Sequence, residues 1–247
     1  IKVEVYIEDD PSENPRLAVE SVKVVMEKVG VKMGAKVKTS GNIPIARGLK
    51  SSSASSNAII MATAAALNVK FDLIDVARLS ALANLRAGTS LTGAFDDACA
   101  SALGNVYLTD NVKMQVVRKF TPSENLKVLF LVPKEKMYSG AVNKKRVKVV
   151  DSLVKKVFYM ALNGDYWSAM TLNGLIYCAV FRINPEPIIV ALKHGAVAAG
   201  LSGKGPTICA VCHENSIDEI REEWDRFEGD LLEARVNVKP AFSGVKP

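Results

Sequence analysis

The chain has 247 residues, enough for one large domain or two smaller ones that each bury a core. Hydrophobic residues make up 49% of it and charged residues 23%, so the composition excludes a disordered chain. The formal net charge of +6 suits either nucleic acid or a phosphate-bearing substrate. The positive residues are scattered and only 6% of all residues are aromatic, so we expect no nucleic-acid partner.

No apolar stretch reaches the ~18 residues that a membrane-spanning helix needs. Four cysteines are too few for a disulfide framework in a chain of this length, which indicates a cytoplasmic protein. Cys209 and Cys212 form a C-x-x-C pattern, but residues three apart on a strand point to opposite faces. We therefore expect buried structural cysteines here. Nothing in the sequence indicates an oligomeric state.

Alternation and helical periodicity predict the elements of the first half. In chain order these are a strand at 2–7, a helix at 15–29, a strand at 35–39, helices at 55–67 and 71–86, a helix within 88–104, and strands at 106–108 and 114–117.

The polar segment 121–125, with proline and serine, marks a domain boundary. Beyond it the patterns predict a strand at 127–132, helices at 141–162, 166–181 and 186–194, strands at 196–201 and 207–212, a helix at 218–227 and a strand at 234–238.

Strands and helices mix without a regular βαβ rhythm, so the fold class is α+β with two domains, 1–122 and 123–247. The chain starts at Ile1 directly with a strand pattern. This start suggests that an N-terminal strand or motif is missing from the sequence.

A first motif, P-I-A-R-G-L-K-S-S-S-A-S-S-N, runs from Pro44 to Asn57 into an alanine-rich helix. The first N–H groups of a helix lack partners within it, and the helix dipole attracts negative charge there. Glycine lets the backbone approach a phosphate, and serine hydroxyls add donors or a magnesium ligand. The alternative is a serine-rich cap on an ordinary buried helix.

A second motif, T-G-A-F-D-D-A-C-A-S, places Asp96 and Asp97 on a helix of small residues. A carboxylate beside an accepting hydroxyl can take its proton, and another can hold Mg²⁺. The alternative is a solvent-facing acidic pair that the helix dipole favours. A third motif, G-L-S-G-K-G-P-T, joins two apolar strands and is typical of either an anion-binding turn or a plain hairpin.

These motifs resemble those of the GHMP kinases, which include homoserine, mevalonate, galacto- and archaeal-type shikimate kinases. The first is similar to their ATP-binding signature, P-x-x-x-G-L-x-S-S-[SA], and the third to their S-G-x-G-P-[ST] segment. Lys50 stands where most members have glycine or a small residue, and this version looks most like the archaeal-type shikimate kinases. No P-loop sequence is present, which argues against a P-loop kinase.

The resemblance implies a ribosomal-S5-like N-terminal domain, a ferredoxin-like C-terminal domain, and ATP- and Mg²⁺-dependent phosphorylation of the 3-hydroxyl of shikimate in aromatic amino acid (chorismate) synthesis. Asp97 aligns best with the family's catalytic base and Asp96 second. The residues that the resemblance assigns to the nucleotide are Gly48, Leu49, Lys50, Ser51, Ser52, Ser53, Ala54, Ser55, Gly203 and Gly205, with Ser53 also on the metal. Those assigned to the substrate are Arg47, Thr92, Gly93 and Ser202.

Shikimate is an anion, so a cationic side chain should bind its carboxylate. The candidates are Arg47, Arg86, Arg146 and Lys145. The sequence departs from the family at its N-terminal P-G-x-x-x-type segment, which is absent. Three alternatives stay open: a homoserine or mevalonate kinase, a nucleic-acid-binding module, and a catalytically inactive relative.

Overall fold

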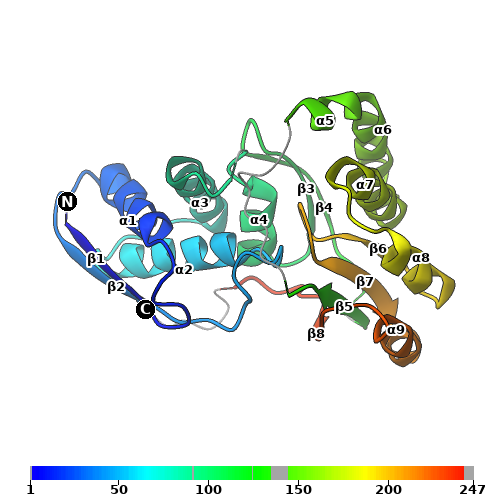
Figure 1. The fold of residues 1–247 in the computed structure, drawn as a ribbon. Helices are drawn as coiled ribbons and strands as arrows, with labels where there is room; N and C mark the ends of the chain where they lie inside the picture. Colours follow the sequence, from blue (N-terminus) through cyan, green and yellow to red (C-terminus); the bar gives the residue numbers. More distant parts are fainter. Residues whose placement is uncertain (1, 91, 124, 135–143, 242–247) are drawn as a thin grey trace. The chain divides into compact units, whose positions relative to one another are not determined.

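The computed structural model describes residues 2–90, 92–123, 125–134 and 144–241 (Figure 1). The chain divides into two compact units. Unit 1 comprises Ile1–Pro44, Lys50–Lys119 and Val238–Pro247, and unit 2 comprises Ile45–Leu49 and Phe120–Asn237. The five-residue segment Ile45–Leu49 thus belongs to the unit that is otherwise built from the second half of the chain. The division of the chain into domains at residues 122 and 123 stays a prediction.

Unit 1 consists of four helices and two pairs of strands among its described residues. They are β1 (Val3–Ile7), α1 (Arg16–Val29), β2 (Ala35–Thr39), α2 (Ser51–Ala66), α3 (Leu73–Ala87), α4 (Phe95–Leu103), β3 (Val106–Asp110) and β4 (Gln115–Phe120). β1 pairs with β2 in parallel, with Val5 opposite Val37, and β3 pairs with β4.

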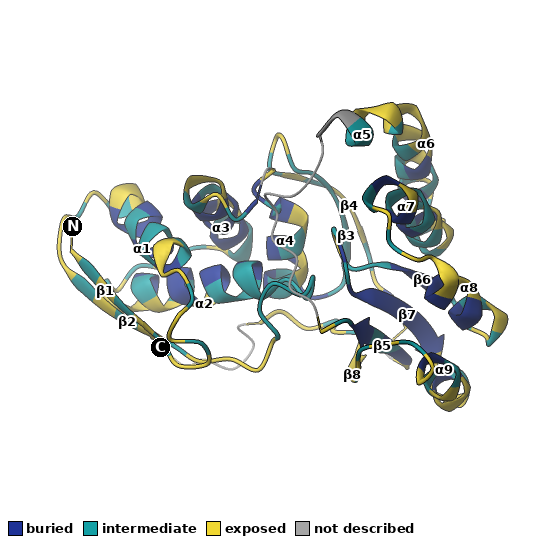
Figure 2. Cartoon of the chain, in the orientation of Figure 1, coloured by how far each residue is buried: buried dark blue, intermediate teal, exposed yellow. Residues whose placement is uncertain are grey.

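Helix α2 packs against α1, α3 and α4 in unit 1. Its small side chains allow these close approaches, and Figure 2 shows it dark blue or teal over most of its length. The hydroxyls of Ser21 and Ser56 lie 2.9 Å apart between α1 and α2. The side-chain amide of Asn57 donates to the carbonyl of Ala98 on α4 at 3.0 Å. Buried polar groups with partners of this kind fix one arrangement of the three helices.

Unit 2 contains an antiparallel sheet in the order β6-β7-β5-β8, with its helices between the strands in sequence. In chain order this is the ferredoxin-like arrangement, in which the first strand lies between the third and the fourth. Its elements are β5 (Leu126–Val132), α5 (Lys144–Val149), α6 (Asp151–Leu162), α7 (Tyr166–Phe181), α8 (Glu186–Lys193), β6 (Ala198–Leu201), β7 (Ile208–His213), the short 3-10 helix Glu214–Ser216, α9 (Ile217–Trp224) and β8 (Asp230–Arg235).

The core of unit 2 lies between this sheet and helices α7, α8 and α9. Trp224 of α9 is fully buried there, and its indole N–H donates to the carbonyl of Pro187 at 2.9 Å. Helix α7 meets β6 through two glycines: a Cβ on Gly174 would lie 2.6 Å from the Cα of Gly200. This contact holds β6, and the loop that follows it, directly against α7.

The α+β class and the ferredoxin-like second half are confirmed, and the three largest differences from the predicted boundaries are as follows. Helix α2 begins at Ser51, four residues before the expected start, because a run of small serines is compatible with a helix once the chain turns before it. The last strand is Asp230–Arg235, earlier than expected, because pairing with β5 sets its register. The expected helix 141–162 is divided between α5 and α6, and its residues 141–143 lie outside the described part of the chain. No helix within the described residues is long and apolar enough to cross a bilayer.

Candidate active site

The chain enters α2 through Lys50, which has a left-handed backbone conformation with φ 64°. A side chain is disfavoured there by about 1–2 kcal/mol, and glycine usually occupies such positions. The carbonyl of Lys50 accepts the first helical hydrogen bond, from the N–H of Ala54 at 3.2 Å. No side chain caps this end of the helix. The N–H groups of Ser51, Ser52 and Ser53 therefore lie at the positive end of the dipole, where an anion binds well.

The ammonium of Lys50 reaches across to the second motif and lies 2.9 Å from Oδ2 of Asp97 on α4. The two side chains are 31% and 17% exposed, so the pair is partly desolvated yet open to solvent. The first and second motifs, which are far apart in the sequence, therefore meet within unit 1. Their meeting places a carboxylate, an ammonium and a helix N-terminus next to one another.

Asp96 has a different environment from Asp97. Its carboxylate accepts from the side-chain amide of Asn111 at 2.7 Å, while its backbone N–H donates to Oδ1 of Asn111 at 3.0 Å. Thr109 donates to the same Asn111 oxygen at 2.9 Å. The side chain of Asn111 thus holds the start of α4 against the turn after β3 through Asp96, and Asp97 is the carboxylate that faces Lys50.

The segment before α4 approaches α3 very closely. Gly93 has φ 80°, and a Cβ there would lie 3.0 Å from the carbonyl oxygen of Ala81 and 3.3 Å from Leu85. Gly93 is buried, whereas Thr92 is exposed. Gly93 therefore sets the position of α4. The side chain of Thr92 is open to solvent.

Within unit 2, the segment Ile45–Leu49 is held against the third motif by two hydroxyl groups. Ser202 Oγ donates to the carbonyl of Gly48 at 2.6 Å, and Thr207 Oγ1 donates to the carbonyl of Arg47 at 2.5 Å. Gly48 has φ 88°, and a Cβ on it would lie 2.7 Å from the carbonyl oxygen of Gly205. Only glycine allows this backbone-to-backbone approach. The glycine of the first motif and the loop of the third therefore form one structural unit.

The turn of the third motif uses some of its N–H groups internally. Gly205 N–H donates to the carbonyl of Ser202 at 3.1 Å, and Ser202 N–H donates to Thr207 at 2.9 Å. Gly205 is buried, whereas Gly203 is exposed with φ 62°. Among the residues expected to contact phosphate, Gly205 thus shapes the turn, and Gly203 presents its backbone to solvent.

The hydroxyl of Ser53 is buried and has no hydrogen-bond partner among the described residues. Asn57 Oδ1, one turn further along α2, and Ser80 Oγ on α3 share this property. Ser51 and Ser52, beside Ser53, are partly exposed. The described part of the chain holds no group of three or more His, Cys, Asp or Glu side chains that could bind a metal ion by themselves.

Arg47 lies at the edge of unit 2, where its guanidinium contacts Asp230 Oδ2 at 3.3 Å and its side chain is 26% exposed. The other described arginines considered for the substrate have partners as well: Arg86 pairs with Glu27 at 2.8 Å, and Arg146 donates to the carbonyl of Ala179 at 2.9 Å. The side chain of Lys145 lies outside the described residues.

The four cysteines are buried thiols, as expected. Burial raises the pKa of Cys99 on α4 to about 12, and nearby Asp96 adds to the effect. Burial also raises the pKa of Cys178 to about 11. A thiol with such a pKa is protonated near neutral pH and is a poor nucleophile.

Sequence reasoning missed Asn111 and Thr207. Asn111 lies in the turn after β3, a place where asparagine is ordinary, and no pattern signals that it binds Asp96. Thr207 stands at the threonine position of the S-G-x-G-P-[ST] pattern, so the pattern did mark the residue but not its contact with Arg47.

A helix N-terminus beside a carboxylate–ammonium pair, and a glycine-rich loop, are features that small-molecule phosphotransferases use. Residues 16–105 match the GHMP kinases N terminal domain, and residues 188–230 match the GHMP kinases C terminal domain. The chain belongs to the GHMP kinase family, which confirms the resemblance seen in the motifs.

Its relatives include archaeal proteins named shikimate kinase. A protein of Methanothrix thermoacetophila named shikimate kinase is 42% identical over 92% of this chain and 78% of its own length. A second shikimate kinase, from Methanosarcina acetivorans, is 36% identical over 96% of this chain and 81% of its own length. In fold the chain is similar to the homoserine kinase of Cytophaga hutchinsonii, with a TM-score of 0.72 and 18% identity over 96% of this chain and 82% of that one.

Proposed function

We propose that the protein is a shikimate kinase, which transfers the γ-phosphoryl group of ATP to the 3-hydroxyl of shikimate. The observation that carries this proposal is the 42% identity to an archaeal shikimate kinase over nearly the whole chain. The Lys50–Asp97 pair at the start of α2 supports the reaction class, because phosphoryl transfer needs positioned charge more than covalent help from the protein.

In this proposal Asp97 accepts the proton of the substrate hydroxyl. The hydroxyl oxygen then forms a bond to the γ-phosphorus while the bond from that phosphorus to the β–γ bridging oxygen breaks, and ADP leaves. Lys50, at 2.9 Å, would orient the carboxylate, and its ammonium would offset negative charge that develops on the transferred group. Asp96 takes a structural role, because Asn111 already engages it.

The nucleotide phosphates would lie at the start of α2, against the N–H groups of Ser51 to Ser53, with Ala54 and Ser55 in the same first turns. Gly48, Leu49, Gly203 and Gly205 would line the phosphates from the glycine-rich segments. The arrangement is supported by the positive φ of Gly48 and Gly203, which opens the backbone to an anion.

Magnesium fits as an ion held mainly by phosphate oxygens and water, since the described residues contain no cluster of ligands of their own. When bound, it would neutralise charge on the transferred phosphoryl group. The unpartnered hydroxyl of Ser53 is the oxygen that fits a direct ligand, although it is buried and the start of α2 would have to open for it. Ser52, which is partly exposed, needs no such movement.

Arg47 is the proposed partner of the shikimate carboxylate, and Asp230 holds its guanidinium in place until substrate binds. Thr92 offers an exposed hydroxyl, and Gly93 sets its position against α3. Ser202 would act on the substrate site indirectly, because its hydroxyl proton is used on Gly48.

The test is ADP release from ATP and Mg²⁺ with shikimate, homoserine or mevalonate as acceptor. Shikimate-dependent release supports the proposal. Release with homoserine or mevalonate instead would keep the family and overturn the substrate. The likeness to homoserine kinase concerns the fold alone. Salt-dependent RNA binding without turnover of any acceptor would replace the proposal by a binding function.

Two neighbouring carboxylates provide a matched comparison for the base. Asp97→Asn should lower kcat by about 10²–10⁴-fold, the range for loss of a general base. Asp96→Asn, on the same turn of α4, should leave kcat within about tenfold and should mainly lower stability, because it weakens the contact with Asn111. Equal losses of kcat in the two variants would contradict the assignment of Asp97.

A further inference from the structure

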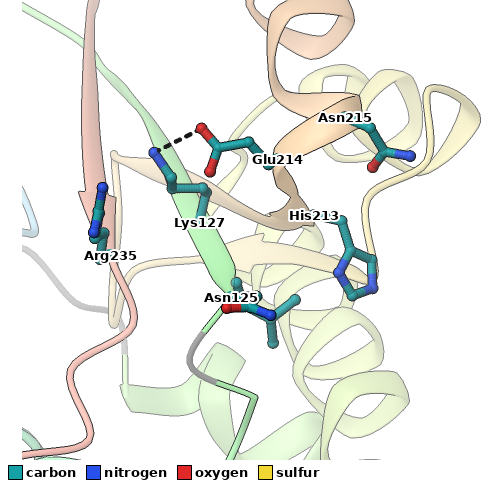
Figure 3. Close-up of a pocket in the computed structure, with 7 residues that line it drawn as sticks. Asn125, Lys127, His213, Glu214, Asn215 and Arg235 are labelled. Atoms are coloured by element: carbon teal, nitrogen blue, oxygen red, sulfur yellow. Dashed lines mark ion pairs between the residues drawn. The ribbon is translucent and has the colours of Figure 1, made fainter.

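Unit 2 contains a cavity of about 420 Å³ that the proposed reaction does not use (Figure 3). Six polar residues line it: Asn125, Lys127, His213, Glu214, Asn215 and Arg235. The volume falls within the range of pockets that take small metabolites.

The cavity lies at the opposite end of β7 from the glycine-rich loop. The third motif leads into Ile208, the first residue of β7, and the cavity begins at His213, the last. A six-residue strand is about 17 Å long, because each residue advances it by about 3.4 Å. The cavity is therefore separate from the phosphate-binding loop of the same sheet.

Two positive side chains that line the cavity belong to residues directly opposite each other in the sheet. Lys127 on β5 is paired with Arg235 on β8, so both side chains lie on one face of the sheet. Like charges at such a pair are destabilising. Lys127 is compensated, since its ammonium contacts Glu233 at 2.6 Å and Glu214 at 3.1 Å. Arg235 is exposed, and it makes no ion pair or side-chain hydrogen bond with a described residue.

Other polar groups that line the cavity can also contribute to the binding of an anion. In Figure 3, Arg235 lies on one side of Asn125 and His213 on the other. The carboxamides of Asn125 and Asn215 and the imidazole of His213 can each donate a hydrogen bond. A guanidinium in a pocket that also holds neutral donors favours an oxyanion, which accepts charge-assisted hydrogen bonds in a forked geometry. Glu214, whose carboxylate contacts Lys127, disfavours a second negative charge there.

We infer that this cavity binds a small metabolite through one oxyanion group, a carboxylate or a phosphate, held by Arg235 and Asn125. The site is distinct from the proposed catalytic residues and does not depend on which alcohol the enzyme phosphorylates. Asn125 and Arg235 also lie within a few residues of two of the four places where the chain passes between the units, namely after Lys119 and after Asn237. A bound oxyanion would link these two connecting segments.

The experiment measures binding of inorganic phosphate and of citrate to the full chain by calorimetry. ADP and Mg²⁺ are kept saturating so that the nucleotide site is filled, and sodium chloride of equal ionic strength is the reference. The probe that binds identifies the class of oxyanion. Arg235→Gln should weaken its binding about tenfold or more, because a charge-assisted hydrogen bond is lost. Arg235→Lys, which keeps the charge, should retain more of the affinity.

Arg226→Gln is the matched control, because Arg226 pairs with Glu223 and does not line the cavity. It should leave binding unchanged. Circular dichroism checks that each variant is folded. Binding that is equal in the wild type and Arg235→Gln would overturn the inference, and so would no binding of either probe beyond chloride. The experiment measures binding and not turnover, so its result is independent of the proposed kinase activity. Either hypothesis can fail while the other is supported.

Discussion

At position 50, two effects of the side chain on the protein can be measured separately. One is the energetic cost of a Cβ on a left-handed backbone, and the other is the contribution of the ammonium to catalysis. Lys50 has φ 64° and contacts Asp97 at 2.9 Å. Replacing it by alanine removes the ammonium but keeps a Cβ in the left-handed region. Replacing it by glycine removes both. The ion pair is missing from both variants, so its contribution cancels in their comparison.

The difference in stability follows from two opposing effects. A Cβ in the left-handed region costs about 1–2 kcal/mol. Glycine loses about 0.5–1 kcal/mol more backbone entropy on folding than alanine does. Lys50→Gly should therefore be more stable than Lys50→Ala, by a difference between these terms of up to about 1.5 kcal/mol. In an exposed helix interior the order would be the reverse, with glycine about 1 kcal/mol less stable.

The activities of the two variants should fall together. Each lacks the ammonium beside Asp97, and the loss of one preorganised group that stabilises developing charge lowers kcat by about 10²–10³-fold. Urea unfolding gives the stability difference, and shikimate-dependent ADP release gives kcat. Alanine more stable than glycine would refute the left-handed conformation. Wild-type turnover in Lys50→Gly would refute the role of the ammonium.

Three further outcomes can be measured on the same protein. Gly48→Ala should lower stability by at least about 2 kcal/mol and raise the KM for ATP, because the new Cβ meets the Gly205 carbonyl. The control is Gly30→Ala, which should lower stability by only about 1 kcal/mol, because Gly30 has a similar φ but open space around it. The hydrogen bond from Lys127 lowers the pKa of Glu233 below its ordinary 4.5, so Glu233 contributes stability above that pH and loses it as the pH falls through the lowered pKa. Urea midpoints of Glu233→Gln should therefore decline less than those of the wild type on acidification below pH 4.5, and a parallel decline would contradict this. Cys99, with its pKa raised to about 12, should resist iodoacetamide in the folded protein at pH 8 and react after unfolding, as mass spectrometry of the labelled peptide can show.

The sequence predicted the fold well where one residue pattern determines the structure. Helical periodicity in α1 and alternation in β5 are local properties, and their positions agree with the structure within one or two residues. The start of α2 was misplaced because serines are equally compatible with a loop and with the first turn of a helix. The register of β8 was misplaced because it depends on pairing with β5, which no local pattern contains.

At the candidate site too, the sequence predicted what a local motif contains and missed what depends on contacts between distant residues. The motifs identified the carboxylates, but only the structure distinguishes Asp97, which contacts Lys50, from Asp96, which contacts Asn111. The left-handed conformation of Lys50 could not be read from a residue type that rarely adopts it. The contact of Gly48 with Ser202 joins residues 154 positions apart, a separation at which residue spacing carries no information.

The membership of Ile45–Leu49 in unit 2 has a consequence for synthesis of the chain on the ribosome. This segment is made early, and its partners Ser202 and Thr207 follow more than 150 residues later. At about 5–20 residues per second, the interval is roughly 8–30 s. The segment must wait through this time without the hydroxyls that hold it. Gly48 therefore reaches its final position only after about 150 further residues have been made.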